Sequence, residues 1–105
     1  MTAGKPVVMV VTATITDAEA YGRYMNALVA SGLFDSFGAT PIATGTVFET
    51  LEGNYADEIT ALVEFPSSEA AHAFWDSPEY RAIANLRAGA GAFRVGLWRK
   101  FRPKV

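Results

Sequence analysis

The sequence predicts an α+β protein in which four antiparallel strands form one sheet with two helical regions on a single face. Three observations support this prediction. Segments in which apolar and β-branched residues alternate, as is typical of strands, occur four times along the chain. Helical capping and spacing signals separate the first such segment from the second, and the third from the fourth. The resulting order, βαββαβ, is that of a ferredoxin-like sandwich.

The first strand is expected at residues 6–15 (PVVMVVTATI), where apolar and β-branched residues dominate. Both of its faces are apolar at the start, which predicts that both are covered. Thr16 and Glu19 then have the spacing of a capping box, which predicts the start of the first helix. One face of this helix carries Tyr21, Tyr24, Met25, Leu28 and Val29. Gly38 is its expected stop, because glycine accepts the left-handed conformation that ends many helices.

Two further strands are expected at residues 39–51 and 57–65, joined as a hairpin by a turn that contains glycine and asparagine. Gly45 within the earlier strand suggests a bulge or a bend. In the later strand Val63 and Glu64 point to opposite faces, because successive side chains of a strand alternate. Glu64 is therefore expected on the sheet face that would line the interior of a dimer.

The second helical region is expected to consist of two helices that meet at an angle. Ser67 or Ser68 can cap the first helix, because a serine oxygen accepts an otherwise unpaired N–H group. Ser77 can cap the second, with Pro78 at its first position, where the missing N–H group costs nothing. The proline ring also disfavours helical angles at Ser77. The last strand is expected at residues 92–101.

Length and composition restrict the class of protein. The 105 residues, 50% of them hydrophobic, are expected to form one domain over residues 1–105, with a flexible N-terminus at residues 1–5. The absence of cysteine and the single histidine exclude thiolate and histidine-rich metal sites within one subunit, so no metal or other cofactor is expected. A net charge of −2 without a basic run argues against nucleic acid as a partner.

The sequence also lacks the signals of membrane insertion and export. No window approaches the roughly 18 consecutive apolar residues of a membrane span, so no membrane partner is expected. The N-terminal residues, MTAGKP, lack the basic region and apolar core of a signal peptide. A cytoplasmic protein is the expectation.

The sheet face opposite the helices is expected to carry too much apolar surface to remain exposed to water. The residues that suggest this are Val8, Val10, Leu62 and Trp98. Two such sheets that face each other across a twofold axis would bury this surface and enclose a barrel-like interior. The sequence therefore predicts a homodimer, a dimeric α+β barrel.

Several short motifs extend over nearly the whole chain: Leu51-Glu52-Gly53, Val63-Glu64-Phe65-Pro66-Ser67, Ala70, Phe74-Trp75, Ser77-Pro78-Glu79-Tyr80 and Arg87. At this spacing they resemble the domain-of-unknown-function family thirteen-thirty (DUF thirteen-thirty), of the dimeric α+β-barrel superfamily. The resemblance implies the barrel fold and, for function, monooxygenase-, isomerase-, lyase- or cyclase-like chemistry. The family often has a Gly-Gly-Arg segment after the first helix, where this chain reads Phe37-Gly38-Ala39-Thr40. An anionic ligand that such an arginine would bind is therefore not assumed here.

Glu64 and Arg87 are the charged candidates for a functional site. Glu64 could act as a catalytic base if it is poorly solvated. The alternative, a structural ion pair with Arg94 or Arg87, is favoured because structural pairs are common. Arg87 lies on the apolar side of its helix and could hold an anionic group, although pairing with a carboxylate is again the favoured role.

Aromatic residues are the candidates for the walls of a ligand pocket. Tyr21, Trp75 and Tyr80 combine flat apolar area with a few polar tips, as ligand sites do, although such residues more often pack in a core. Their expected pocket lies between these helical residues and the sheet face that carries Glu64. His72 is interpreted as a surface residue, because its neighbours at four-residue spacing along the helix are polar.

Two functional hypotheses follow. The first is a small enzyme or ligand carrier that acts on an apolar small molecule without a tightly bound cofactor. The second is a non-catalytic structural or regulatory dimer. A cavity that a ligand can reach would favour the first, and a fully packed core would favour the second. The sequence leaves open whether the protein is an enzyme.

Overall fold

The computed structural model describes residues 5–55 and 57–100. Its elements, in chain order, are β1 (Val7–Ile15), α1 (Ala18–Ser31), α2 (Leu33–Ser36), β2 (Thr40–Thr46), β3 (Ile59–Phe65), α3 (Ser68–Asp76), α4 (Pro78–Ala84), a 3₁₀ turn η1 (Asn85–Arg87) and β4 (Gly91–Arg99). The flexible N-terminus was expected at residues 1–5. Of these, residues 1–4 lie outside the described residues.

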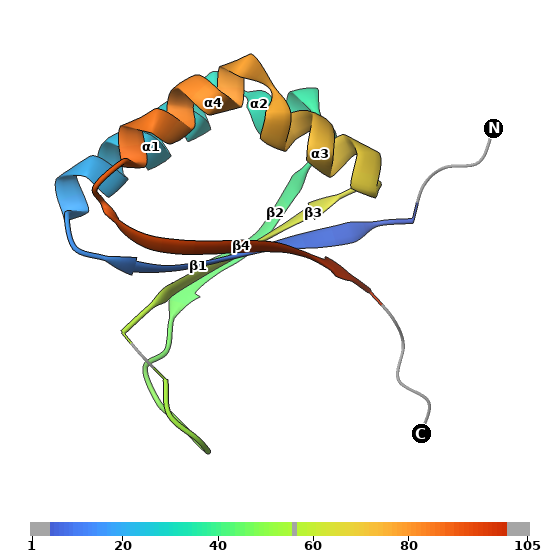
Figure 1. Ribbon diagram of the computed structural model, residues 1–105. Coiled ribbons are helices and arrows are strands. Elements are labelled where there is room, and N and C mark those ends of the chain that lie inside the picture. The colour runs from blue at the N-terminus through green and yellow to red at the C-terminus, as the bar shows by residue number, and fades with distance from the viewer. Residues whose placement is uncertain (1–4, 56, 101–105) are drawn as a thin grey trace, which may run out of the picture.

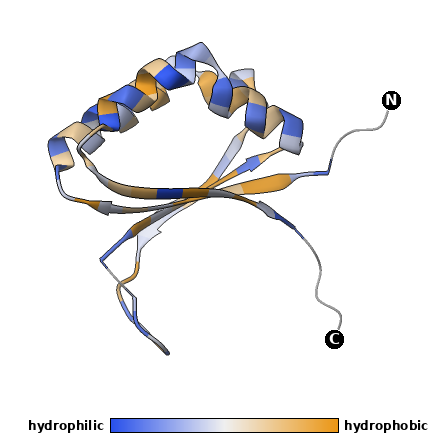
Figure 2. Cartoon of the chain, in the orientation of Figure 1, coloured by the Kyte–Doolittle hydropathy of each residue, from blue (hydrophilic) through white to orange (hydrophobic). Residues whose placement is uncertain are grey.

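The four strands form one antiparallel sheet in the order β2-β3-β1-β4, and the helices all lie on one of its faces (Figure 1). This arrangement confirms the predicted ferredoxin-like sandwich. The strands at the centre of the sheet are β1 and β3. Figure 2 shows that the helices carry both hydrophilic and hydrophobic residues, as expected for helices with one face on a sheet.

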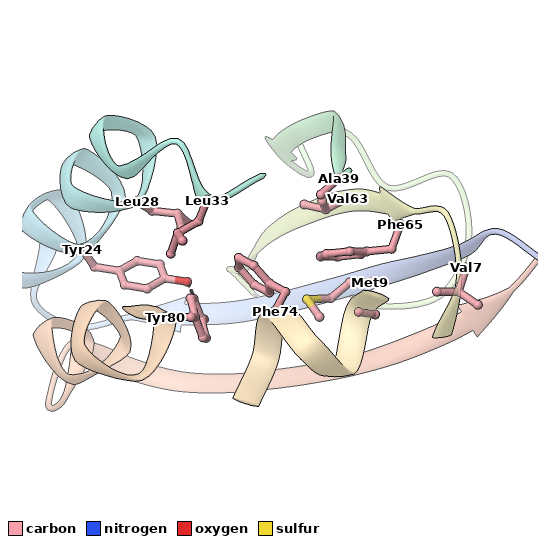
Figure 3. Packing of buried hydrophobic residues seen from close by; sticks show 11 residues of the cluster. Val7, Met9, Tyr24, Leu28, Leu33, Ala39, Val63, Phe65, Phe74 and Tyr80 are labelled. Atoms are coloured by element: carbon pink, nitrogen blue, oxygen red, sulfur yellow. Dashed lines mark hydrogen bonds between the residues drawn. The ribbon is translucent and has the colours of Figure 1, made fainter. Parts of the chain in front are cut away.

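The core lies between the helices and the sheet (Figure 3). Its buried residues are Val7, Met9, Tyr24, Leu28, Leu33, Ala39, Val63, Phe65, Ala71, Phe74 and Tyr80. Phe65 and Phe74 are the largest side chains that are fully buried, and their ring centroids lie 5.4 Å apart. Burial of an aromatic side chain of this size contributes roughly 2 to 3 kcal/mol to folding, so this pair joins α3 firmly to β3.

The first helix begins and ends at residues other than those expected. Its N-cap is Asp17, whose carboxylate accepts hydrogen bonds from the backbone N–H groups of the first turn, so the predicted capping box is wrong. The hydroxyl group of Thr16 instead donates a hydrogen bond to the carbonyl of Ala90, which connects the start of α1 to the start of β4. The helix ends at Gly32, which has φ of +70°, and not at Gly38.

The hairpin strands are shorter than expected. The strand β2 ends at Thr46 instead of residue 51, and β3 begins at Ile59 instead of residue 57. The bulge lies between Pro41 and Ala43, whereas Gly45 pairs regularly with its partner in β3, so the expected position was wrong. The segment between the strands projects from the sheet away from the helices (Figure 1).

The second helical region confirms the predicted break. The helix α3 ends at Asp76, and Ser77 has extended angles of φ −64° and ψ 143° before α4 begins at Pro78. Ser67 caps α3 and Ser77 caps α4, each by accepting a backbone hydrogen bond. The following strand β4 begins one residue earlier than expected, and the predicted end at residue 101 lies outside the described residues.

The sheet face opposite the helices, which we call the outer face, carries several apolar side chains. Val8 lies between Trp98 and Glu64 on the neighbouring strands, and Val10 pairs with Leu62. Trp98 is 65% exposed. An exposed tryptophan beside branched aliphatic residues is unusual for a surface that faces only water.

Candidate functional site

A cavity of about 440 Å³ lies between the helices and the sheet, on the side of α1, β2 and β3. Its interior is formed by core residues that include Met9, Val63 and Phe74. Exposed residues that line it, such as Val29 on α1 and Pro41 on β2, place its opening between these two elements. The walls are therefore mainly hydrocarbon, with a route to solvent.

Two of the residues that line this apolar space are tyrosines joined by their hydroxyl groups. The hydroxyl groups of Tyr24 on α1 and Tyr80 on α4 lie 2.8 Å apart and form a buried hydrogen bond (Figure 3). Tyr80 is positioned by the break between α3 and α4, because its backbone N–H group donates to Ser77 Oγ. Both tyrosines line the cavity, so the local capping of α4 determines where one of its polar groups lies.

Burial keeps the phenols of Tyr24 and of its neighbour Tyr21 protonated. The pKa of Tyr24 is raised far above its usual value, chiefly by burial and also by Tyr80, while the positive charge of Arg87 lowers it in part. Burial likewise raises the pKa of Tyr21, and Arg87 again opposes the shift. At neutral pH these groups are therefore hydrogen-bond donors, and they cannot serve as bases.

Arg87 lies against the aromatic rings of Tyr24 and Phe93. Its guanidinium carbon is 4.2 Å from the ring centroid of Phe93 and 5.5 Å from that of Tyr24, which are distances for cation–π contacts. Its Nε is buried and has no hydrogen-bond partner within residues 5–55 and 57–100. The favoured pairing of Arg87 with a carboxylate is wrong, because the ion pairs found in this part of the chain involve other cations.

Glu64 lies on the outer face, so the sheet separates it from the helix-side cavity. Its carboxylate is 3.3 Å from Lys100 Nζ, while Arg94 pairs with Glu58 at 2.9 Å. The expected ion pair of Glu64 is confirmed. The expected partner, Arg94 or Arg87, is wrong, because the partner is Lys100. The pocket expected between the face of Glu64 and the helices does not exist, because the helices cover the opposite face of the sheet.

The structure brings together two of the three aromatic candidates. Tyr21 and Tyr80 line the cavity, whereas Trp75 lines a smaller neighbouring pocket of about 190 Å³ together with the exposed His72. The rings of Trp75 and Tyr80 nevertheless lie 5.5 Å apart. The sequence placed Tyr24 on the buried face of α1 without marking it as a site residue, and no local signal reveals its hydrogen bond to a tyrosine 56 positions later.

The described residues contain no cluster of three or more acidic or histidine side chains that could hold a metal ion. Within the same ranges, each helix is too short or too polar to span a membrane. The cavity is mainly apolar, and its lining includes the phenol groups of tyrosines and one acidic residue, Asp35.

A family model described as "Domain of unknown function (DUF1330)" matches residues 6–100. The chain belongs to this family. Among proteins of curated function, none is significantly similar to this DUF1330 protein in sequence.

Several solved structures share the fold of this DUF1330 protein, including the following three. A dimeric ferredoxin-like protein of unknown function from Jannaschia sp. CCS1 has a TM-score of 0.71 at 16% identity, over 90% of this chain and 99% of that one. A hydroxynitrile lyase from Passiflora edulis has a TM-score of 0.74 at 13% identity, over 96% and 98% of the two chains. SnoaB, a cofactor-independent oxygenase from Streptomyces nogalater, has a TM-score of 0.64 at 11% identity, over 95% and 97%. At these identities the likeness shows the fold alone.

Proposed function

We propose that this DUF1330 protein binds a small, mainly apolar molecule in the cavity between helices and sheet, without a tightly bound cofactor. The cavity carries this proposal. Its volume of about 440 Å³ falls within the roughly 300 to 1,000 Å³ that is usual for small-molecule sites. A core packed only for stability rarely leaves so large an opening next to a fully buried aromatic side chain such as Phe74.

The chemistry that best suits the site is cofactor-independent. The phenols of Tyr24 and Tyr80 can hydrogen-bond a ligand oxygen, and the surrounding apolar walls would exclude water from a reacting group. The structural likeness to a cofactor-independent oxygenase and to a hydroxynitrile lyase supports a lyase- or monooxygenase-like reaction. Isomerase- and cyclase-like reactions, which the family resemblance also implies, are the other candidates. The alternative of a non-catalytic dimer gives the cavity no role.

We propose in addition that the protein is a homodimer that buries the outer face. Val10 and Leu62 lie side by side on this face, and the exposed Trp98 lies nearby. The dimeric state of the similar ferredoxin-like protein supports this arrangement. Association would transfer these side chains out of water while leaving the helix-side cavity free for a ligand.

The cavity can be tested with α-methylstyrene, an uncharged hydrocarbon probe. We expect it to shift the backbone NMR resonances of residues around the cavity in a titration of the full chain. Ala61→Phe should abolish binding, because Ala61 lines the cavity and a phenyl ring would occupy it. Ala82→Phe is the matched control, since Ala82 is exposed on α4. Equal binding to both variants, or no binding to the unaltered protein, would refute the proposal.

A further inference from the structure

The geometry points to an uncharged, largely hydrocarbon ligand with one carbonyl-type oxygen, which accepts a hydrogen bond from the Tyr24–Tyr80 hydroxyl pair. This inference rests on the proposed function of the cavity and defines the class of molecule that it selects.

The hydrogen-bond inventory of the two phenols carries the argument. Each hydroxyl has one proton, so the pair has two, and the contact of 2.8 Å uses one of them. Neither hydroxyl has any other protein partner among residues 5–55 and 57–100. The second proton therefore needs an acceptor, because an unpaired donor in an apolar interior costs free energy. Since both tyrosines line the cavity, a ligand there can supply that acceptor.

The charges around the cavity favour a neutral ligand over an anion. Among the described residues that line it, Asp35 is the single acidic residue and no basic residue is present; Asp35 lies exposed on α2 near the opening. Arg87 is held over the rings of Phe93 and Tyr24, Arg81 lies over the ring of Tyr80, and neither arginine lines the cavity. A carboxylate ligand would thus pass an acidic residue and lose its hydration without gaining a direct ion pair.

Arg87 has a different effect on a neutral carbonyl. Its positive charge makes Tyr24 more acidic than burial alone would leave it, and this strengthens the phenol as a donor. Burial meanwhile keeps the hydroxyl proton of Tyr24 in place. A carbonyl oxygen, which has lone pairs and no charge, matches such a donor without the cost of burying an ion.

Three probes of similar size separate these chemistries. Acetophenone carries a carbonyl where α-methylstyrene carries a methylene group, so the two share a shape and differ in the acceptor. Benzoylformate keeps the ketone of acetophenone and carries a carboxylate in place of its methyl group. Dissociation constants are measured by NMR titration of the full chain and of the Tyr24→Phe/Tyr80→Phe double variant. This variant removes both hydroxyl groups together, so it leaves no unpaired partner and is expected to fold.

The decisive quantity is the ratio of the dissociation constant of α-methylstyrene to that of acetophenone. We expect this ratio to be roughly three- to tenfold higher in the unaltered protein than in the double variant, which corresponds to one hydrogen bond between neutral groups. Each single variant, Tyr24→Phe or Tyr80→Phe, should keep most of the preference, because the remaining hydroxyl still has a proton to donate. A purely structural role of the tyrosines would change both constants equally.

An equal ratio in the unaltered protein and the double variant would overturn this inference, as would tighter binding of benzoylformate than of acetophenone. If α-methylstyrene binds and Ala61→Phe abolishes its binding, the cavity remains a ligand site even though the inference has failed. If none of the probes binds, the proposed function fails and the inference fails with it.

Discussion

Replacing Ser77 by alanine should destabilise the junction between α3 and α4 by about 2 kcal/mol. The Ser77 hydroxyl accepts a hydrogen bond from the Tyr80 N–H group at 3.1 Å and donates one to the Phe74 carbonyl at 2.9 Å, and the residue is only 8% exposed. Loss of an N-cap of this kind costs about 1 kcal/mol, and loss of the second bond in a buried site costs about 1 kcal/mol more.

The assay is equilibrium unfolding in urea at one fixed protein concentration, because self-association would make stability depend on concentration. Ser67→Ala is the matched control. Ser67 caps α3 with a bond of 3.1 Å to the Ala70 N–H group, and no second bond of its side chain is found among the described residues. We expect Ser67→Ala to cost about half as much. If the two variants lose equal stability, the second hydrogen bond of Ser77 contributes nothing and the reasoning is wrong.

Four further outcomes are expected. Gly91→Ala should lower the free energy of unfolding by at least about 2 kcal/mol in urea, because its Cβ would lie 2.0 Å from the Thr14 carbonyl oxygen at a φ of +157°. The free energy of unfolding should fall as pH rises above about 10, because Tyr24 ionises there in the unfolded chain but not in the folded one. Tyr24→Phe should make this pH dependence less steep, and an unchanged slope in the variant would contradict the explanation. Glu64→Gln should lower the free energy of unfolding by less than about 1 kcal/mol in the same assay and leave α-methylstyrene binding unchanged. Lost binding at unchanged stability would show that Glu64 contributes to the ligand site. Sedimentation should give twice the chain mass of 11.3 kDa, and Val10→Asp should shift it to the monomer; a monomeric unaltered protein would defeat the dimer.

Elements with strong local signals could be predicted from the sequence. The break between α3 and α4 depends on Ser77 and Pro78 alone, because a capping hydroxyl and a fixed ring act on their immediate neighbours. The start of α1 could not be decided in this way. Thr16 and Asp17 are adjacent and both can cap, and the choice depends on the backbone at Ala90, which accepts bonds from both of their N–H groups.

The register of β2 required knowledge of its partner strand. The alternation from Ile42 onward reads as one continuous strand, but Ile42 falls within the register shift, and pairing with β3 stops at Thr46. Alternation describes which side chains share a face only while the ladder of hydrogen bonds persists. The sequence contains no signal for the point at which the ladder ends, so residues 47–51 were wrongly assigned to the strand.

The candidate site could be predicted only in part for a similar reason. Helical spacing placed Tyr21 on the buried face of α1, and it does line the cavity. The alternation that puts Val63 beneath the helices puts Glu64 on the outer face. Glu64 could therefore not share a pocket with the helical residues, although such a pocket was expected from the sequence. The partner of Arg87 depended on which aromatic rings surround it in three dimensions, and these come from distant parts of the chain.

The central strand β1 has a consequence for how relatives of this protein can diverge. Met9 and Val11 line the cavity, while Val8 and Val10 face the other side of the sheet. Substitutions at odd positions can therefore reshape the ligand space without altering the residues available for assembly, and the reverse holds for even positions. A single inserted residue would exchange the two sets at once. Selection can thus tolerate many replacements in this strand while strongly opposing any change in its length.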